Sequence, residues 1–333
     1  MREFVIGRNE AGQRLDKYLR KLLKEAPDGF LYKMLRKKNI TLEGRRASGN
    51  EMLAEGMSVK LFLSEETFEK MAGQEALLPA GRKKGGKRAF SLSPENIVYE
   101  DRDLVLVNKP PGVLVHSRGA GEETLAGALL SYLASPGKLD RRELAAFRPA
   151  PMNRLDMNTS GLVLCGASLP GEQFLARAIR ERTIRKEYLC VVRGSFPFEG
   201  KKSAYLAKDG RRNRVFISEK EKEGMEPIET AFYPLAESGG FTLLKVLLIS
   251  GKPHQIRAHL ACLGYPLPGD PKYGDPELNA RIAREAGLFR QCLHAHQVTF
   301  LEAEGEFGRL RGRTFTAPCP KDFIKVLKVT GLE

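Results

Sequence analysis

One short segment of the sequence brings acidic, basic and turn-forming residues together: Asn153-Arg154-Leu155-Asp156-Met157-Asn158-Thr159-Ser160-Gly161. It precedes the apolar run Leu162–Cys165, which predicts a strand, so we expect a loop that enters the core. A carboxylate in such a loop, close to a guanidinium, can act as a nucleophile or a general base. The same pattern also fits an ordinary hydrogen-bonded turn in which Asp156 has no chemical role.

Two pairs of histidines could suggest a metal site, His254 with His259 and His294 with His296. Their H-x4-H and H-A-H spacings differ from the zinc spacing of HExxH enzymes, and no cysteine cluster accompanies them. The chain also has no G-x-G-x-x-G that links a strand to a helix, and no G-x-x-x-x-G-K-[ST]. We therefore expect neither a metal nor a cofactor.

The elements that must position these residues are short strands and a few helices, which begin near residue 91. The predicted strands are Leu104–Val107, Leu162–Cys165, Tyr188–Val192, Thr230–Tyr233, Phe241–Ile249 and Gln297–Leu301. The predicted helices are Glu123–Ala134, Glu172–Arg182, Gln255–Leu263 and Phe323–Lys328. Several strands are joined without room for a crossover helix, so we expect an α+β fold with a largely antiparallel sheet.

Composition narrows the class of protein. The 333 residues are 42% hydrophobic and 29% charged, which suits two domains and excludes a wholly disordered or fibrous chain. Lys and Arg outnumber Asp and Glu by 55 to 41, an excess that favours nucleic acid as a partner before a membrane. The five cysteines are scattered, and no signal peptide or 18-residue apolar run occurs. These features predict a cytoplasmic protein with reduced thiols and no membrane span.

The positive charge is concentrated near the N-terminus, where residues 1–90 carry 20 Lys and Arg against 12 Asp and Glu. Leucines at helical spacing after Leu15 predict one helix, and Phe30–Leu35 predict a second, each with basic residues outward. Residues 64–90 are polar, irregular and finally basic, which predicts a flexible basic linker. Ordinary solvated helix faces are the alternative explanation of these charges.

The N-terminal stretches QRLDKYLRKLL, YKMLRKKNITLEGRRA and LAEGMSVKLFL resemble the S-four-like RNA-binding domain, which is named for a ribosomal protein. This resemblance implies a small α/β RNA-binding domain at residues 1–63, the linker at 64–90 and a catalytic domain at 91–333. It also implies that the two helices and the following turn contact the RNA backbone. The candidate RNA-binding residues are Arg14, Lys17, Arg36, Lys37, Lys38, Arg45 and Arg46.

The segment NRLDMNTSGL resembles the HRLDxxTSGL motif of the RluA family of pseudouridine synthases, and the other family blocks follow in order. These blocks are KPPGVLVH, KEYLCVVRG, GKPHQIRAHLACLGYPLPGDPKYG and LHAHQVTF. The resemblance runs from about residue 95 to 318 and implies the pseudouridine synthase fold. Asn153 stands where the family usually has His, so the role of that position stays open.

The resemblance implies a cofactor-free isomerase in which Asp156, Tyr188 and Arg257 are catalytic. Asp156 would attack the anomeric carbon or remove the neighbouring ribose proton, and the sequence does not choose between these routes. A guanidinium close by would keep that carboxylate ionised, and Arg257 matches the family residue that does so. The candidate substrate-binding residues are Arg154, Leu293, Lys109 and Thr159.

Roles other than catalysis or substrate binding are possible for several of these residues. Arg257 could make a structural ion pair or a phosphate contact, Tyr188 could be a core residue, and Leu293 could simply fill space. The expected partner is structured RNA bound by a monomer, with large-subunit ribosomal RNA favoured over transfer RNA. The rival functions are an RNA-binding protein with an inactive synthase domain and an RNA N-glycosidase that stops after bond cleavage.

Overall fold

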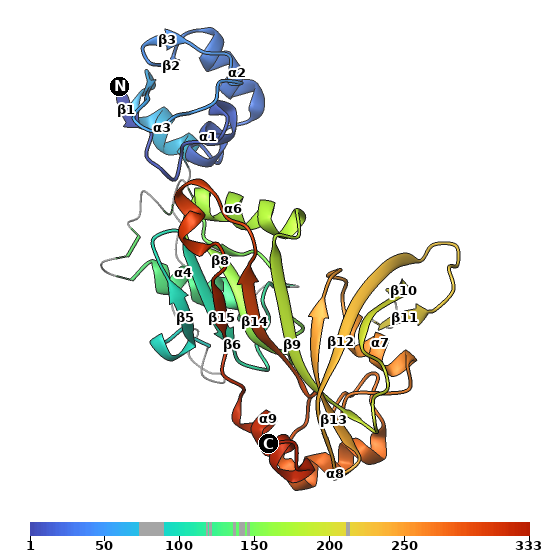
Figure 1. Cartoon of the computed structure of the whole chain (residues 1–333). Helices are drawn as coiled ribbons and strands as arrows, with labels where there is room; N and C mark the ends of the chain where they lie inside the picture. The colour runs from blue at the N-terminus through green and yellow to red at the C-terminus, as the bar shows by residue number, and fades with distance from the viewer. Residues whose placement is uncertain are drawn as a thin grey trace.

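The computed structural model describes residues 1–72 and 90–333, except for 118, 120, 121, 136, 137, 140–143, 145, 146 and 211–213. Within these residues two separate sheets form, each with its own apolar core (Figure 1). Every described helix is too short or too polar to span a bilayer.

The N-terminal module consists of residues 1–72. Its four-stranded sheet has the order β1 (Arg2–Val5), β4 (Ser58–Leu61), β2 (Ile40–Leu42), β3 (Arg45–Arg46). Helices α1 (Leu15–Leu22) and α2 (Asp28–Arg36) pack on it because their leucines recur on one face, and the expected basic residues lie on the other. The two helices predicted from the sequence are thus present.

The expected boundary at residue 63 is wrong for the part of the linker that the structure describes. Residues Glu65–Ala72 form helix α3, and the remaining linker positions up to 89 lie outside the described residues. Phe68 is 7% exposed and stacks on Phe4 with ring centroids 5.9 Å apart. This aromatic contact and the neighbouring apolar residues make α3 a part of the N-terminal core.

The large sheet has the order β11-β10-β12-β13-β9-β14-β8-β6-β5, with β15 paired to β14 and β7 paired to β8. Among the described strands only the β14–β8 pair is parallel, so the predicted α+β fold with a largely antiparallel sheet is confirmed. The strands are β5 (Ile97–Glu100), β6 (Leu104–Lys109), β7 (Ala150–Pro151), β8 (Ser160–Gly166), β9 (Ile184–Arg193), β10 (Gly200–Asp209), β11 (Arg214–Ser218), β12 (Glu226–Ser238), β13 (Phe241–Leu248), β14 (Leu293–Phe300) and β15 (Thr314–Thr316).

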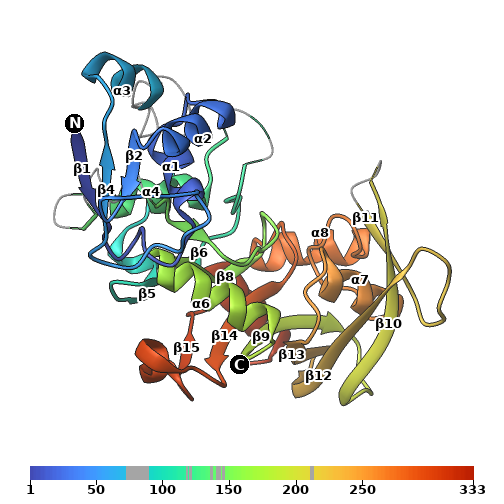
Figure 2. The same ribbon diagram turned by 90° about the horizontal axis from the view of Figure 1, so that it is seen from above.

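Helices flank this sheet. They are α4 (Leu125–Leu133), α6 (Leu169–Arg180), α7 (Gln255–Cys262), α8 (Pro276–Ala286) and α9 (Lys321–Thr330), with short 3-10 turns at Pro94–Asn96 and Gly305–Leu310. The four predicted helices are present with shifted ends, whereas α8 was not predicted. In Figure 2 the N-terminal module lies on the side of β5 and β6, and the β10–β11 hairpin lies on the opposite side.

The N-terminal module contacts the beginning of α6 (Figures 1 and 2). Arg8 donates to Asp103 at 3.0 Å, and the backbone N–H of Leu169 donates to Asn9 at 3.2 Å. Gln173 donates to a carbonyl of the module at 3.3 Å. These contacts fix the module at one end of α6, while the other end of that helix leads into β9.

Candidate active site

The loop that carries Asp156 connects β7 to β8, as the sequence predicts. The Asn153 side chain accepts a hydrogen bond from the Leu164 N–H at 2.7 Å, which fastens the start of the loop to β8. The Thr159 N–H donates to the carbonyl of Asp156 at 3.0 Å, which closes a turn just before the strand. Asn153 therefore has a structural role in this chain: its side-chain amide, in place of the usual histidine ring, anchors the start of the loop.

Close packing of backbones explains the glycine at the end of the motif. Gly161 has φ +113°, and a Cβ there would lie 2.2 Å from the carbonyl oxygen of Ala295. Only glycine accepts both the conformation and the contact, so β8 can run directly beside β14. The loop is thereby held against the strand that carries Leu293.

Asp156 and Arg257 meet although they are 101 residues apart. The Arg257 Nη1 donates to Asp156 Oδ2 at 2.6 Å, while its Nε and Nη2 donate to the two oxygens of Asp270 at 2.7 and 2.8 Å. The side chains of Arg257 and Asp270 are 4% and 0% exposed, but that of Asp156 is 26% exposed. The guanidinium of Arg257 thus bridges the fully buried carboxylate of Asp270 and the partly exposed carboxylate of Asp156.

The electrostatics of the buried pair favour the ionised forms of Arg257 and Asp270. Burial alone would raise the pKa of Asp270, but hydrogen bonds and charge from Arg257 outweigh it and hold that pKa below its ordinary value. Burial opposes the charge of Arg257, yet the two carboxylates raise its pKa above its ordinary value. Asp270 also accepts hydrogen bonds from the backbone N–H groups of Lys272 and Tyr273.

A pocket of about 530 Å³ lies in front of Asp156, within the size range of small-molecule sites. Tyr188, Leu293, Arg154 and Thr159 all line it. Burial, followed by the negative charge of Asp156, raises the pKa of Tyr188, so its phenol stays protonated at neutral pH. The structure therefore brings six of the seven expected catalytic and substrate-binding residues to one cavity.

Lys109 is the exception, and its assignment as a substrate-binding residue is wrong. Its side chain is completely buried, and its Nζ donates to the carbonyls of Pro110, Val113 and Met157, each at 2.9 Å. All three ammonium protons point at protein acceptors, so none is left for a substrate. Because Met157 follows Asp156 directly, the hydrogen bond from Lys109 to the Met157 carbonyl helps to hold the Asp156 loop in place.

Lys109 gives a testable dependence of stability on pH. Burial lowers its pKa from 10.5 to about 7, so the cost of burying the ammonium is present in full below pH 7 and fades as pH rises towards 10.5. The unfolding free energy of the wild type, relative to a Lys109→Met variant, should therefore rise by about 2 kcal/mol between pH 7 and about pH 9 in urea titrations.

The exposed residue Lys328 offers the matched control, Lys328→Met, which should leave this pH trend unchanged. A constant or falling difference between wild type and Lys109→Met would contradict the prediction. It would mean that the three carbonyl acceptors keep Lys109 charged throughout this range.

Sequence reasoning missed His254 as part of the site. Its backbone adopts φ +53°, an unusual conformation for a non-glycine residue and one that is enriched at functional sites. Tyr273 accepts a hydrogen bond from the Val215 N–H at 2.8 Å and lies 2.9 Å from His254 Nδ1. Its hydroxyl proton is thus free to point at Nδ1, which leaves the Nε2 proton facing Asp156 Oδ1 at 3.9 Å.

Two cations at the rim, Arg182 and Lys186, were also missed. Both line the pocket, and Lys186 precedes Tyr188 by two residues on β9. The signal was present in the sequence, because alternate residues of a strand share a face. Asp156 is the only acidic residue among the described residues that line the pocket, against five Lys and Arg side chains.

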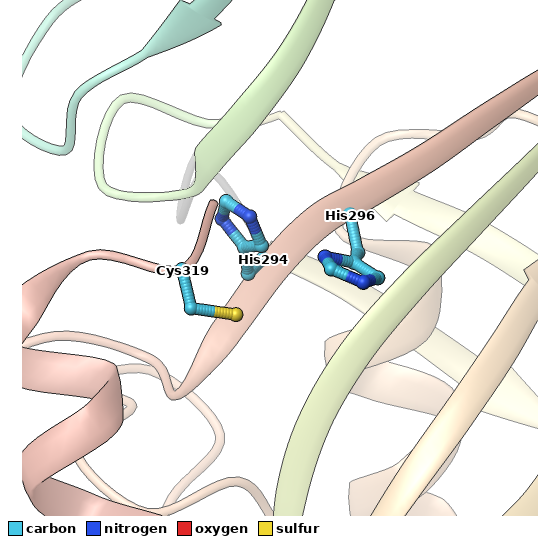
Figure 3. Close-up of side chains that lie close together, drawn as sticks. All are labelled: His294, His296 and Cys319. Carbon is cyan, nitrogen blue, oxygen red and sulfur yellow. The ribbon is translucent and has the colours of Figure 1, made fainter. Parts of the chain in front are cut away.

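The remaining histidine pair lies away from this pocket. One atom from each of His294, His296 and Cys319 falls within 4.8 Å of the others (Figure 3). His294 Nε2 and His296 Nδ1 both lie 3.1 Å from the carbonyl of Ala317, and His294 Nδ1 lies 2.9 Å from the Ser160 hydroxyl. Both nitrogens of His294 are therefore engaged, and burial lowers its pKa to about 4. The cluster fastens the chain around Ala317 to β14.

Comparison with known sequences gives matches over nearly the whole chain. A family model described as RNA pseudouridylate synthase matches residues 103–262. Ribosomal large subunit pseudouridine synthase D from Neisseria meningitidis serogroup A is 31% identical over 97% of this chain and 80% of its own length. Ribosomal large subunit pseudouridine synthase C from Salmonella typhi is 30% identical over 98% of this chain and 95% of its own length.

Comparison with solved structures supports the fold. Human RNA Pseudouridylate Synthase Domain Containing 4 aligns with a TM-score of 0.53 and 19% identity, covering 70% of this chain and 92% of its own. At that identity the similarity concerns the fold alone. It agrees with the large mixed sheet described above.

Proposed function

The chain belongs to the RNA pseudouridylate synthase family and is an isomerase that acts on RNA; from this premise we propose that it modifies uridine in large-subunit ribosomal RNA through Asp156. The observation that carries the role of Asp156 is its contact with Arg257 at 2.6 Å at the wall of a pocket. The names of its relatives support the ribosomal substrate.

The reaction needs little beyond a positioned carboxylate. The bond from the ribose carbon C1′ to uracil N1 breaks, the base turns, and C1′ joins C5 instead. The C5 proton is lost and N1 gains one, so the atoms balance without an oxidant or a phosphate donor. In the pocket Asp156 Oδ1 would face the sugar, because Oδ2 is bound to Arg257. Either nucleophilic attack at C1′ or removal of the C2′ proton is compatible with this geometry.

The side chains around Asp156 suit an extruded nucleotide. A base stacked inside a duplex cannot reach an enclosed carboxylate, so the target uridine must leave the stack. Tyr188 offers an aromatic surface for the base, and Arg154, which is exposed at the rim, can occupy the place that the base vacates. We assign Leu293 and Thr159 to the pocket wall.

Mapping pseudouridine by carbodiimide in ribosomal and transfer RNA tests the proposed substrate. RNA from cells that lack the gene should miss pseudouridine at one or more positions of the large-subunit RNA, and the purified protein should restore it. Loss confined to transfer RNA would identify the alternative substrate. Free uracil in the products would identify an N-glycosidase, and unchanged RNA would indicate an inactive synthase domain.

We assign RNA backbone binding to the N-terminal module. All seven candidate residues are exposed, and only Arg14 is paired with a carboxylate, at 3.0 Å from Asp16. The other six have no carboxylate within 4.0 Å among the described residues. Helix α6 spans 12 residues, or about 18 Å, between this module and the pocket rim, a distance that one RNA can bridge.

Deleting residues 1–72 should weaken RNA binding yet leave slow isomerisation of short RNA. Each lost phosphate contact should flatten the slope of log K against log salt by about 0.7 to 0.9, which fluorescence titrations at several salt concentrations can measure. The deletion removes Arg8, which donates a hydrogen bond to Asp103. Asp103 still accepts a hydrogen bond from Ser168 at 2.5 Å, so its carboxylate keeps a partner and the catalytic domain should fold.

The full-length triple variant Arg36→Gln, Lys37→Gln and Lys38→Gln is the matched control, because it removes charge and retains the module. It should reproduce part of the loss in affinity and slope. A folded truncation with no activity on any RNA would contradict this division of roles.

A further inference from the structure

The pocket face of β9 carries three residues in alternation. Ile184, Lys186 and Tyr188 all line the pocket, as expected for positions two apart on a strand. The repeat between alternate residues is about 7 Å. Lys186 is therefore one strand repeat away from Tyr188, whose ring we assign to binding the base, and both side chains face the pocket.

Lys186 is a partly buried cation that has no hydrogen-bond or ion-pair partner among the residues that the structure describes. Within the described residues no carboxylate lies within 4.0 Å of its Nζ and no acceptor is hydrogen-bonded to it. Burial, followed by the charge of Arg182, lowers its pKa, so this position is electrostatically unfavourable in the free protein. Lys109 shows how the same chain treats a lysine with a structural role, because that ammonium has three carbonyl acceptors.

Arg182 adds a second cation at the same rim. It follows the end of α6 with φ +60°, a conformation that costs energy for a residue with a side chain, and it lines the pocket. Its side chain is exposed and likewise has no carboxylate within 4.0 Å among the described residues. Two neighbouring cations that repel each other, each with no carboxylate within 4.0 Å among the described residues, form a site in which an anion would be stabilised.

We propose that Lys186 and Arg182 form a phosphate subsite that binds the RNA backbone at a linkage next to the target uridine. This inference rests on the proposed function, since it takes Tyr188 and Asp156 as the positions of base and sugar. A nucleotide carries its phosphates one sugar away from its base, so a base at Tyr188 brings a phosphate within reach of Lys186. By holding this phosphate, the subsite would keep the sugar of the extruded nucleotide in position next to Asp156.

The subsite can be tested by removing the charge from either side of the contact. The probe is a short fluorescent RNA centred on the uridine that the mapping experiment identifies, with either natural phosphates or one neutral methylphosphonate next to that uridine. Lys186→Met keeps the length of the side chain and removes its charge, and Lys328→Met on α9 is the control for loss of one distant lysine. Thermal unfolding checks that each variant is folded.

Lys186→Met should raise the dissociation constant for the natural RNA roughly tenfold, the usual effect of one charge-assisted hydrogen bond. Its salt slope should fall by about 0.7, as for one phosphate contact to a single strand. The methylphosphonate should weaken binding to the wild type and to Lys328→Met, but should weaken Lys186→Met less, because only Arg182 is left there to bind the phosphate. Arg182→Gln should give a smaller loss at the same linkage.

The inference is overturned if the neutral linkage weakens Lys186→Met as much as wild type, or if the variant binds normally while the wild type makes pseudouridine. In both cases the proposed function stands. If instead the wild type makes no pseudouridine in any RNA, the proposed function itself fails. Should Lys186→Met not fold, the effect of the neutral linkage on Arg182→Gln alone decides the question.

Discussion

An Asp156→Asn variant is expected to bind RNA with nearly unchanged affinity and to form no measurable pseudouridine. The amide has the size of the carboxylate and can still accept a hydrogen bond from Arg257. It cannot attack C1′ or take up the C2′ proton, because it lacks the negative charge that both routes require. Loss of a general base alone costs about 10²- to 10⁴-fold, and loss of a nucleophile costs at least as much.

Single-turnover release of tritium from RNA labelled at C5 of uridine measures this loss, and fluorescence anisotropy measures binding. Asp322→Asn is a matched control, since Asp322 also pairs with an arginine, Arg290, at 2.7 Å but does not line the pocket. It should retain activity once stability is taken into account. An active Asp156→Asn variant would refute the role assigned to this carboxylate.

The elements that position Asp156 and Arg257 could be predicted from the sequence because the relevant signals are local and strong. Strand β8 contains the apolar run Leu162–Cys165 and is buried over its whole length, and the loop before it carries the segment Arg154-Leu155-Asp156. Helix α7 follows from Ile256 and Leu260, which recur at helical spacing and are both buried. The expected contact of Arg257 with Asp156 depends on these two elements, and the structure has it.

The parts that were missed have weaker or misread signals. Strand β10 carries Lys201, Lys202 and Lys208 and has only Ala204 and Leu206 buried, so its pattern resembles a polar loop. Helix α8 has Asp275 as its N-cap and Pro276 at its first position, a start signal that was present but not used. For α6 the corresponding signal is Ser168, whose hydroxyl accepts from the Gly171 N–H.

Residue types alone could not separate the three roles of basic residues at the site. Lys109, Lys186 and Arg257 all occur in segments that resemble the family blocks. Among the described residues, however, Lys109 binds the carbonyls of a loop, Lys186 lines the pocket without an ion-pair partner, and Arg257 joins two carboxylates. What distinguishes them is the set of acceptors within reach. That set is fixed by loops and strands distant in sequence, so it emerges only in three dimensions.

The second large effect is expected for Arg257, whose removal should damage stability and catalysis together. In Arg257→Met the side chain of Asp270, which is fully buried, loses both guanidinium hydrogen bonds, and Asp156 loses its cation. Leaving a buried charge without its partner costs about 3–5 kcal/mol. Arg257→Lys should recover little, because a single ammonium cannot bind Asp270 through two parallel hydrogen bonds and also reach Asp156.

Urea unfolding at several pH values separates the electrostatic part of this effect. The folded pKa of Asp270 is lowered, so the stabilisation that it gains from Arg257 is present above the unfolded pKa of about 3.9 and is lost as pH falls through the folded value. The difference in unfolding free energy between wild type and Arg257→Met should thus be largest at neutral pH and shrink on acidification below about pH 4.

The double variant Arg257→Met with Asp270→Asn then distinguishes a structural arginine from a catalytic one. Removing the buried negative charge should restore much of the lost stability, because no ion is left without a partner in the core. It should not restore isomerisation, since Asp156 would still lack the guanidinium that orients its carboxylate through the contact at 2.6 Å. If activity returned together with stability, Arg257 would be only a structural ion pair, and Asp156 would need no cationic partner to react.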